Sequence, residues 1–171
     1  MQCPVHHRET TWFFGGHDVA TNNIAWVVRH MPVVVVPGDG RYLVQPIHVD
    51  DFTQICLRAA HDLTDTITDA VGPDRMTYDE LVRAVRDALQ KKTPVVHAPP
   101  AAVAILSRAF GVVLRDVVLT RDEIHGLTGG LLVSHQPALG RISFLEWLQE
   151  NAPTLGRAYA NDLDRHFRVR G

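Results

Sequence analysis

Four consecutive valines, Val33–Val36, place the strongest constraint on what this 171-residue chain can fold into. They lie between a helical pattern that Pro32 ends and the turn-forming segment Pro37-Gly-Asp-Gly40. A β-branched run without a polar face predicts a strand that is buried on both sides. Strand and helix patterns alternate in the first part of the chain, and helical patterns prevail in the last part. The sequence therefore predicts a mixed α/β fold around one small core.

Capping residues and apolar spacing predict the other elements. Helices are expected after a cap at Asn22 or Asn23, after a cap at Asp50, after the capping boxes Thr77–Glu80 and Ser143–Glu146, from Pro99-Pro100, and over the amphipathic tail Thr154–Phe167. Strands or extended segments are expected at residues 11–14, 42–44, 67–71 and 93–98.

Composition excludes several classes of protein. The formal net charge of -2 gives no electrostatic reason to expect binding to nucleic acid or to an anionic membrane. The longest apolar runs are too short to span a bilayer, and the N-terminus has no signal-peptide pattern. Cys3 and Cys56 form neither a disulfide framework nor a Cys-x-x-Cys site, so a reducing cytoplasm is expected. His6, His7 and His17 lack a second ligand pair at the usual spacing, so we expect no metal site.

The segment from Pro37 to Asp51, Pro-Gly-Asp-Gly-Arg-Tyr-Leu-Val-Gln-Pro-Ile-His-Val-Asp-Asp, resembles part of the atypical extended short-chain dehydrogenases. These include NAD(P)-dependent sugar-nucleotide epimerase/dehydratase-like proteins and relatives of an accessory subunit of respiratory complex I. Ala70–Leu81 is similar to the family's strand, Gly-Pro turn and capped helix, and Thr11–Ile24 to its preceding strand and turn. The resemblance, from about Thr11 to Phe167, implies partial Rossmann-type parallel strands plus a mostly helical C-terminal substrate-side region. Residues 21–171 would form that region, after a poorly defined start over residues 1–20 with a possible strand.

Two motifs of this family are missing from the sequence. The family binds NAD(P) at a Gly-x-x-Gly-x-x-Gly turn, and no such spacing occurs here; the nearest glycine cluster, Gly126–Gly130, does not follow a strand and is interpreted as a turn or helix end. The family's Tyr-x-x-x-Lys pair, in which lysine lowers the pKa of the tyrosine, is also absent. The residues four positions after the three tyrosines are Pro46, Val82 and Leu163. We therefore expect no catalytic or cofactor-binding residue in this chain alone, and NAD(P) is implied only for the intact family.

The resemblance further implies that this half lines a substrate cleft above the cofactor. The implied substrate-binding residues are His17, Asp18, Gly38, Arg41, Gln45 and Arg115. Arg41 and Arg115 could clamp a phosphate or be ordinary surface arginines, and Gln45 with Pro46 could simply fix a backbone turn. His48 could act as a base or ligand, or it could be a packing residue. Asp50 and Asp51 could form a carboxylate pair, or one could cap a helix while the other is solvated in its first turn.

Two functions remain open from the sequence. The first is the substrate-binding half of an NAD(P)-dependent sugar-nucleotide epimerase, dehydratase or reductase, which needs a chain supplying the missing dinucleotide-binding half. The second is a non-enzymatic binding or assembly module. A sheet without its neighbours exposes unpaired backbone groups, so a homo-oligomer is a further expectation. A nucleotide sugar is the possible ligand, with no nucleic acid and no membrane span.

Overall fold

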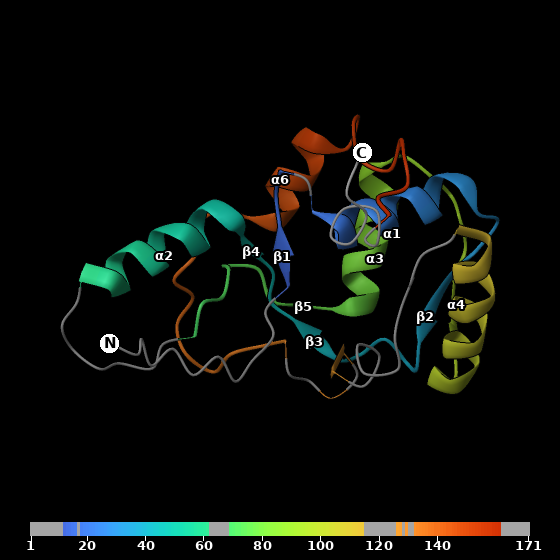
Figure 1. The fold of residues 1–171 in the computed structure, drawn as a ribbon, viewed down its shortest axis with the longest axis horizontal. Helices are drawn as coiled ribbons and strands as arrows, with labels where there is room; N and C mark the ends of the chain where they lie inside the picture. Colours follow the sequence, from blue (N-terminus) through green and yellow to red (C-terminus); the bar gives the residue numbers. More distant parts are fainter. Residues whose placement is uncertain are drawn as a thin grey trace, which may run out of the picture.

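The fold is mixed α/β and is taken from a computed structural model that describes residues 12–16, 18–61, 69–114, 126–127, 129 and 132–161 (Figure 1). Its strands are β1 (Phe13–Phe14), β2 (Val34–Pro37), β3 (Leu43–Val44), β4 (Ile47–His48), β5 (Met76–Thr77) and β6 (Val95–Ala98). Its helices are α1 (Val19–His30), α2 (Val49–His61), α3 (Tyr78–Ala88), α4 (Pro100–Leu114) and α6 (Phe144–Asn151). The predicted α/β class is confirmed.

The strands form pairs, and two of the pairs are parallel. β2 lies parallel to β6 in a register that sets Val34 beside Val95 and Pro37 beside Ala98. β1 lies parallel to β4, and β3 runs antiparallel to β5. Parallel strands need crossover connections, and here helices lie within both of them, α1 between β1 and β4, and α2 and α3 between β2 and β6.

The valine run forms β2 from Val34 on, and the strand is buried on one face and half-buried on the other, where complete burial on both was predicted. Val34 and Val36 belong to the main core, to which β1, α1, α3 and α6 contribute the buried side chains Phe14, Val28, Leu81, Val85, Phe144 and Leu148. Val35 points the other way and packs on Val103 and Ala104 of α4. Alternate residues of a strand point to opposite faces, so β2 separates the main core from α4.

The N-cap predicted for the first helix is wrong. Asp18 caps α1, and its carboxylate accepts from the backbone amides of the first turn at 2.9–3.2 Å. Asn22 and Asn23, the predicted caps, lie inside the helix and bind the C-terminal segment instead. Asn22 accepts from the Gly156 amide at 3.0 Å, and Asn23 both donates to the Ala160 carbonyl and accepts from its amide at 2.9 Å. Their amide groups therefore hold a distant stretch of chain against α1.

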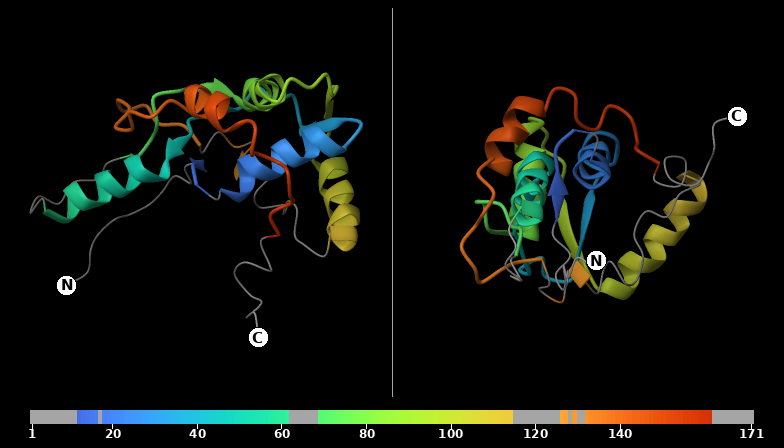
Figure 2. Two further views of the ribbon diagram at one scale, coloured as in Figure 1. Left: turned by 90° about the horizontal axis from the view of Figure 1, so that it is seen from above. Right: turned by 60° about the vertical axis from the view of Figure 1, so that its left-hand side comes forward.

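The start of α2 also differs from prediction. The helix begins at Val49, so Asp50 lies in its first turn. Asp51, expected to be a solvated neighbour, accepts from the backbone amides of Arg141 and Ile142 at 2.7 and 2.8 Å. Beyond this anchor α2 extends away from the rest of the protein (Figures 1 and 2).

One predicted capping box is confirmed and the other is changed. Thr77 and Glu80 bond reciprocally at the start of α3. Ser143 is the N-cap of α6 and accepts from the Glu146 amide at 3.2 Å. The carboxylate beside this cap belongs to Asp74, which accepts from the Ser143 hydroxyl and from a first-turn amide.

Two predicted elements do not form where they can be observed. Residues 154–161 of the expected tail helix form turns, bends and irregular chain, because Asn22 and Asn23 bind backbone groups that a helix would use itself. Residues 69–71 of the expected strand are not in a sheet, and the Val71 carbonyl accepts from the amides of Leu139 and Gly140. The remaining residues of both predictions lie outside the described ranges. Within those ranges, no helix combines the length and apolar character needed to cross a bilayer.

Candidate functional site

In parallel α/β sheets, ligands bind beyond the carboxyl ends of the strands, so the ends of the two parallel pairs are the places to examine. The first of these ends carries the turn after β1 and the histidine that ends β4. Gly15 in this turn has φ +110°, and a Cβ added there would lie 2.4 Å from Nε2 of His48. Only glycine can therefore occupy position 15 beside the imidazole.

His48 is fixed from three sides. Its ring is buried against Phe14, with centroids 5.1 Å apart, and Trp147 lies at 6.4 Å. Its Nδ1 accepts from the Asp50 backbone amide at 3.2 Å. In the neutral ring the proton is therefore on Nε2, which faces the Gly15 turn. The packing interpretation of His48 agrees with this burial, and Nε2–H still offers one oriented donor at the end of β1 and β4.

The substrate residues predicted at this turn are only partly visible. The Asp18 carboxylate caps α1, which fixes its position at the end of the turn. His17 lies outside the described residues.

The second end, beyond β2 and β6, carries the turn of Pro37 to Gly40. Gly38 and Gly40 have φ values of +64° and +69°, which glycine adopts without strain. The Gly38 amide donates to the Ala98 carbonyl at 2.8 Å and ties the turn to the end of β6. Arg41 follows with an exposed side chain, and its amide donates to Asp39 at 3.0 Å. Gly38 and Arg41 thus belong to one rigid turn, at the end of which the Arg41 side chain is exposed.

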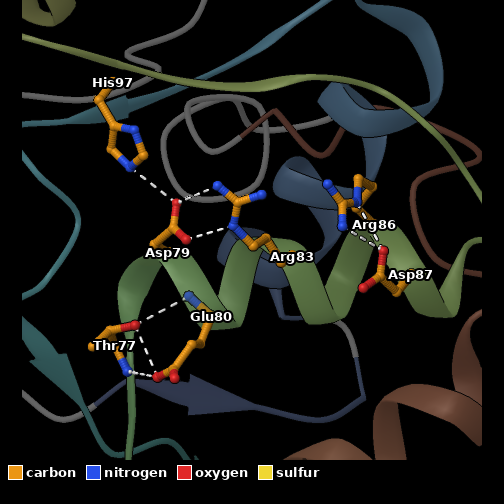
Figure 3. A network of polar contacts seen from close by, with 7 residues as sticks. All are labelled: Thr77, Asp79, Glu80, Arg83, Arg86, Asp87 and His97. Carbon is orange, nitrogen blue, oxygen red and sulfur yellow. Dashed lines mark hydrogen bonds and ion pairs between the residues drawn. The ribbon is translucent and has the colours of Figure 1, made fainter.

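A polar network lies beside this turn, at the start of α3 (Figure 3). Asp79 accepts hydrogen bonds from Nε and Nη2 of Arg83, and its Oδ1 lies 2.9 Å from Nε2 of His97 on β6. The hydrogen bond from Arg83 is the main cause that holds the pKa of Asp79 below its ordinary value, and the charges of Arg83 and His97 add to it. A Cβ on Gly40 would lie 3.0 Å from Cβ of Asp79, so the turn packs directly on this network.

Two stacked tyrosines support the same region. Tyr42 and Tyr78 have ring centroids 5.4 Å apart, and the Tyr42 hydroxyl donates to the Pro37 carbonyl at 3.2 Å. Burial is the main cause that raises the pKa of Tyr42, and burial raises the pKa of Tyr78 to about 12. Both phenols therefore remain neutral near pH 7, which is the opposite of the activation that acid–base tyrosines need.

Gln45 directly follows β3 and is not at the carboxyl end of either parallel pair. Its side chain is buried, with Nε2 donating to the Gly72 carbonyl at 2.9 Å and Oε1 accepting from the Ser134 amide at 3.3 Å. Ser134 in turn donates from Oγ to Asp69 at 2.6 Å. Both ends of the Gln45 amide are thus used to join three parts of the chain. Arg115 lies outside the described residues.

The predicted site residues fall in three environments: Asp18 at the first strand end, Gly38 and Arg41 at the second, and Gln45 in the interior. The network around Asp79 was missed by sequence reasoning. The spacing of Asp79 and Arg83, four residues apart on a helix, is a usable signal for that pair. His97 joins them only through the pairing of β6 with β2. Within the described ranges, no three His, Cys, Asp or Glu side chains are grouped to hold a metal ion.

Comparisons with known proteins give a likeness of fold. No protein-family model and no curated protein matches the sequence. A UDP-N-acetylglucosamine 4-epimerase from Methanobrevibacter ruminantium M1, solved in complex with UDP-N-acetylmuramic acid, superposes with a TM-score of 0.50 at 16% identity over 83% of this chain and 43% of its own. A dTDP-4-dehydrorhamnose reductase from Yersinia enterocolitica gives 0.41 at 12% identity, over 71% of this chain and 47% of its own.

The chain thus spans less than half the length of either of these two proteins. What it shares with the epimerase at this identity is the fold.

Proposed function

We propose that this chain is the substrate-binding half of an NAD(P)-dependent sugar-nucleotide epimerase, dehydratase or reductase, and that it is not catalytic by itself. The observation that carries the proposal is the superposition on UDP-N-acetylglucosamine 4-epimerase over 83% of the chain. The similarity of Pro37–Asp51 to extended short-chain dehydrogenases supports it independently. We further propose that the protein acts in the cytoplasm.

In this proposal residues at the carboxyl ends of the parallel strand pairs contribute contacts to a nucleotide sugar. The exposed Arg41 guanidinium, at the end of a rigid turn, has the chemistry to bind a pyrophosphate with paired hydrogen bonds. Gly38 lets the chain turn there, and Arg115 would add a second positive charge. At the other end, the turn with His17 and Asp18 and the Nε2–H donor of His48 would contact the sugar. The buried side chain of Gln45 would help to fix the chain segments that carry these residues.

The remaining parts of the enzyme would come from a dinucleotide-binding half. The sequence has neither the glycine turn that admits a pyrophosphate to a helix N-terminus nor a tyrosine activated by lysine. NAD(P) would therefore be held by that other half, and this chain would hold and orient the nucleotide sugar.

Calorimetric titration of the purified protein with UDP-N-acetylglucosamine tests the proposal. We expect saturable binding that Arg41→Ala weakens about tenfold, because a charge-assisted pair is lost. Arg75→Ala, at another exposed arginine, is the matched control and should bind normally. Absence of binding would overturn the proposal, and turnover of the sugar with NAD(P) by this chain alone would overturn its non-catalytic part.

The second candidate is a non-enzymatic assembly module. Exposed apolar side chains favour it: Ile105 and Leu106 on α4 are 68% and 45% exposed, and Val96 on β6 is 42% exposed. Single exposed leucines are ordinary, but neighbouring ones on a helix and the strand beneath it indicate a contact surface. The same titration separates the candidates, because a module of this kind would not bind the nucleotide sugar.

A further inference from the structure

The turn that carries Arg41 is held from two sides. On one side the Gly38 amide donates to the Ala98 carbonyl at 2.8 Å, at the end of β6. On the other side the Gly40 carbonyl accepts from the Asp79 amide at 3.1 Å, at the start of α3. The position of the turn, and with it that of Arg41, therefore depends on how the end of β6 lies relative to the start of α3.

One side-chain contact joins these two supports to each other (Figure 3). Nε2 of His97 on β6 lies 2.9 Å from Oδ1 of Asp79 in the first turn of α3. The pKa of Asp79 is lowered, so this side chain is an ionised carboxylate near pH 7 and only accepts hydrogen bonds. The imidazole therefore donates its Nε2 proton to Asp79. Among the described residues, no other hydrogen bond or ion pair joins β6 to α3.

Gly40 lies directly against this contact. A Cβ added to Gly40 would lie 3.0 Å from Cβ of Asp79 and 3.2 Å from Nε2 of His97. The turn therefore packs on both partners of the hydrogen bond. Because the packing is this close, a change in the separation of the two partners would also move the backbone of the turn.

We propose that His97 is a positioning residue, which through Asp79 fixes the turn in the orientation that lets Arg41 contact the pyrophosphate of a nucleotide sugar. The inference rests on the proposed function and deepens it. His97 acts through Asp79 and Gly40 and not by touching the ligand. A turn that already has its bound conformation loses less conformational entropy on binding, so a residue that holds this turn raises the affinity.

The second partner of Asp79 provides a matched control. Arg83 lies four residues further along the same helix and binds both oxygens of the Asp79 carboxylate. It orients this carboxylate on α3 but does not connect α3 to the turn or to β6. The side chains of Arg83 and His97 are 40% and 37% exposed, so either can be shortened to alanine without opening a cavity in the core.

Backbone amide hydrogen exchange at Gly38 and Asp79, measured on the full chain without ligand, tests the positioning. His97→Ala should raise both exchange rates at least about tenfold, because the turn opens more easily without the contact between its supports. His97→Gln, whose amide can donate to Asp79 in place of the imidazole, should restore most of the protection. Arg83→Ala should change these rates less than about threefold. The amide of Val85, buried in α3, reports global stability and should exchange equally in all variants.

Calorimetric titration of the same variants with UDP-N-acetylglucosamine connects the turn to binding. His97→Ala should raise the dissociation constant about three- to tenfold, and His97→Gln should bring it back close to the wild-type value. Unchanged exchange at Gly38 and Asp79 in His97→Ala, an equal effect of Arg83→Ala on that exchange, or an affinity indifferent to His97→Ala would overturn the inference. Failure of the proposed function is seen separately, as absence of binding by the wild-type protein, and the exchange rates then still decide whether His97 fixes the turn.

Discussion

Individual polar side chains in this protein connect segments that are far apart in sequence. Gln45 joins the segments of Gly72 and Ser134, and Asp79 joins its own helix to His97 on β6. Their partners are backbone groups or residues on other elements, so the identity of the residue alone does not reveal the partner. The pair of Asp79 with Arg83 could be predicted from helical spacing, but the contact with His97 could not, because it depends on how β6 lies beside β2.

Replacing Asp79 by asparagine should destabilise the protein in a pH-dependent way. We expect a loss of about 1–2 kcal/mol at pH 7, because two charge-assisted contacts disappear. The folded-state pKa of Asp79 is lowered, so its stabilisation is present above the ordinary value of 3.8 and is lost as pH falls through the folded pKa. Urea denaturation at pH 7 and at pH 3 should therefore show a smaller difference from wild type at pH 3. Asp87→Asn, which removes an exposed pair with Arg86, is the control and should change stability by less than about 1 kcal/mol.

Gly15 and Gly16 offer a matched pair of substitutions at the His48 turn. Both have positive φ, but a Cβ on Gly15 would collide with the His48 ring, while a Cβ on Gly16 has no atom within 4 Å. Gly16→Ala should cost about 1 kcal/mol from backbone strain alone. Gly15→Ala should cost at least about 2 kcal/mol, because the imidazole must also move. If Gly15→Ala and Gly16→Ala lower the stability equally, as measured by thermal and urea unfolding, His48 does not set the requirement for glycine.

At the scale of elements, capping decides where the helices begin. The capping box Thr77–Glu80 and the N-cap Ser143 marked the starts of α3 and α6, because each cap side chain accepts from an amide three residues further on. The cap of α1 could not be assigned in the same way, since Asp18, Asn22 and Asn23 are all competent caps. The structure selects Asp18, because Asn22 and Asn23 are used to bind residues 156–160.

The capping box of α3 can be tested with two substitutions at one position. Thr77→Ala should lower the free energy of unfolding by about 1 kcal/mol, because the Glu80 amide loses its acceptor. Thr77→Ser keeps the hydroxyl and should preserve most of that stability. The Thr77 amide is the main cause of the lowered pKa of Glu80, so NMR titration of the two variants should still find this pKa low. A similar loss for both variants would point to the methyl group of Thr77 and not to its hydroxyl.

At the scale of the whole molecule, the core lies between α1, α3 and α6, and the two helices α2 and α4 extend at opposite ends (Figure 1). The buried amide of Gln45 joins the segments around residues 72 and 134 to each other. Further contacts hold the same segments, among them the hydrogen bond from the Gln45 amide to the Leu132 carbonyl and those from Leu139 and Gly140 to the Val71 carbonyl.

Replacing Gln45 by leucine should affect stability far more than its volume suggests. The Gly72 carbonyl and the Ser134 amide would both be left without this partner, at a cost of about 1–3 kcal/mol for each buried group. The rate of backbone amide hydrogen exchange should then rise in residues 132–139. Gln149→Leu, on the exposed side of α6, is the control and should stay within about 0.5 kcal/mol of wild type. Unchanged exchange in residues 132–139 would mean that other contacts hold this segment.

Local pattern by itself determined the α/β class, the buried valine strand, the segment that became β6, and the caps at Thr77 and Ser143. Each depends on residues within a few positions of one another, whose conformational preferences exist before the chain is folded. The tertiary structure alone decided the cap of α1, the loss of helix over residues 154–161, the network around Asp79 and the burial of Gln45. In these cases several local conformations have similar free energies, and contacts between distant segments determine which one forms.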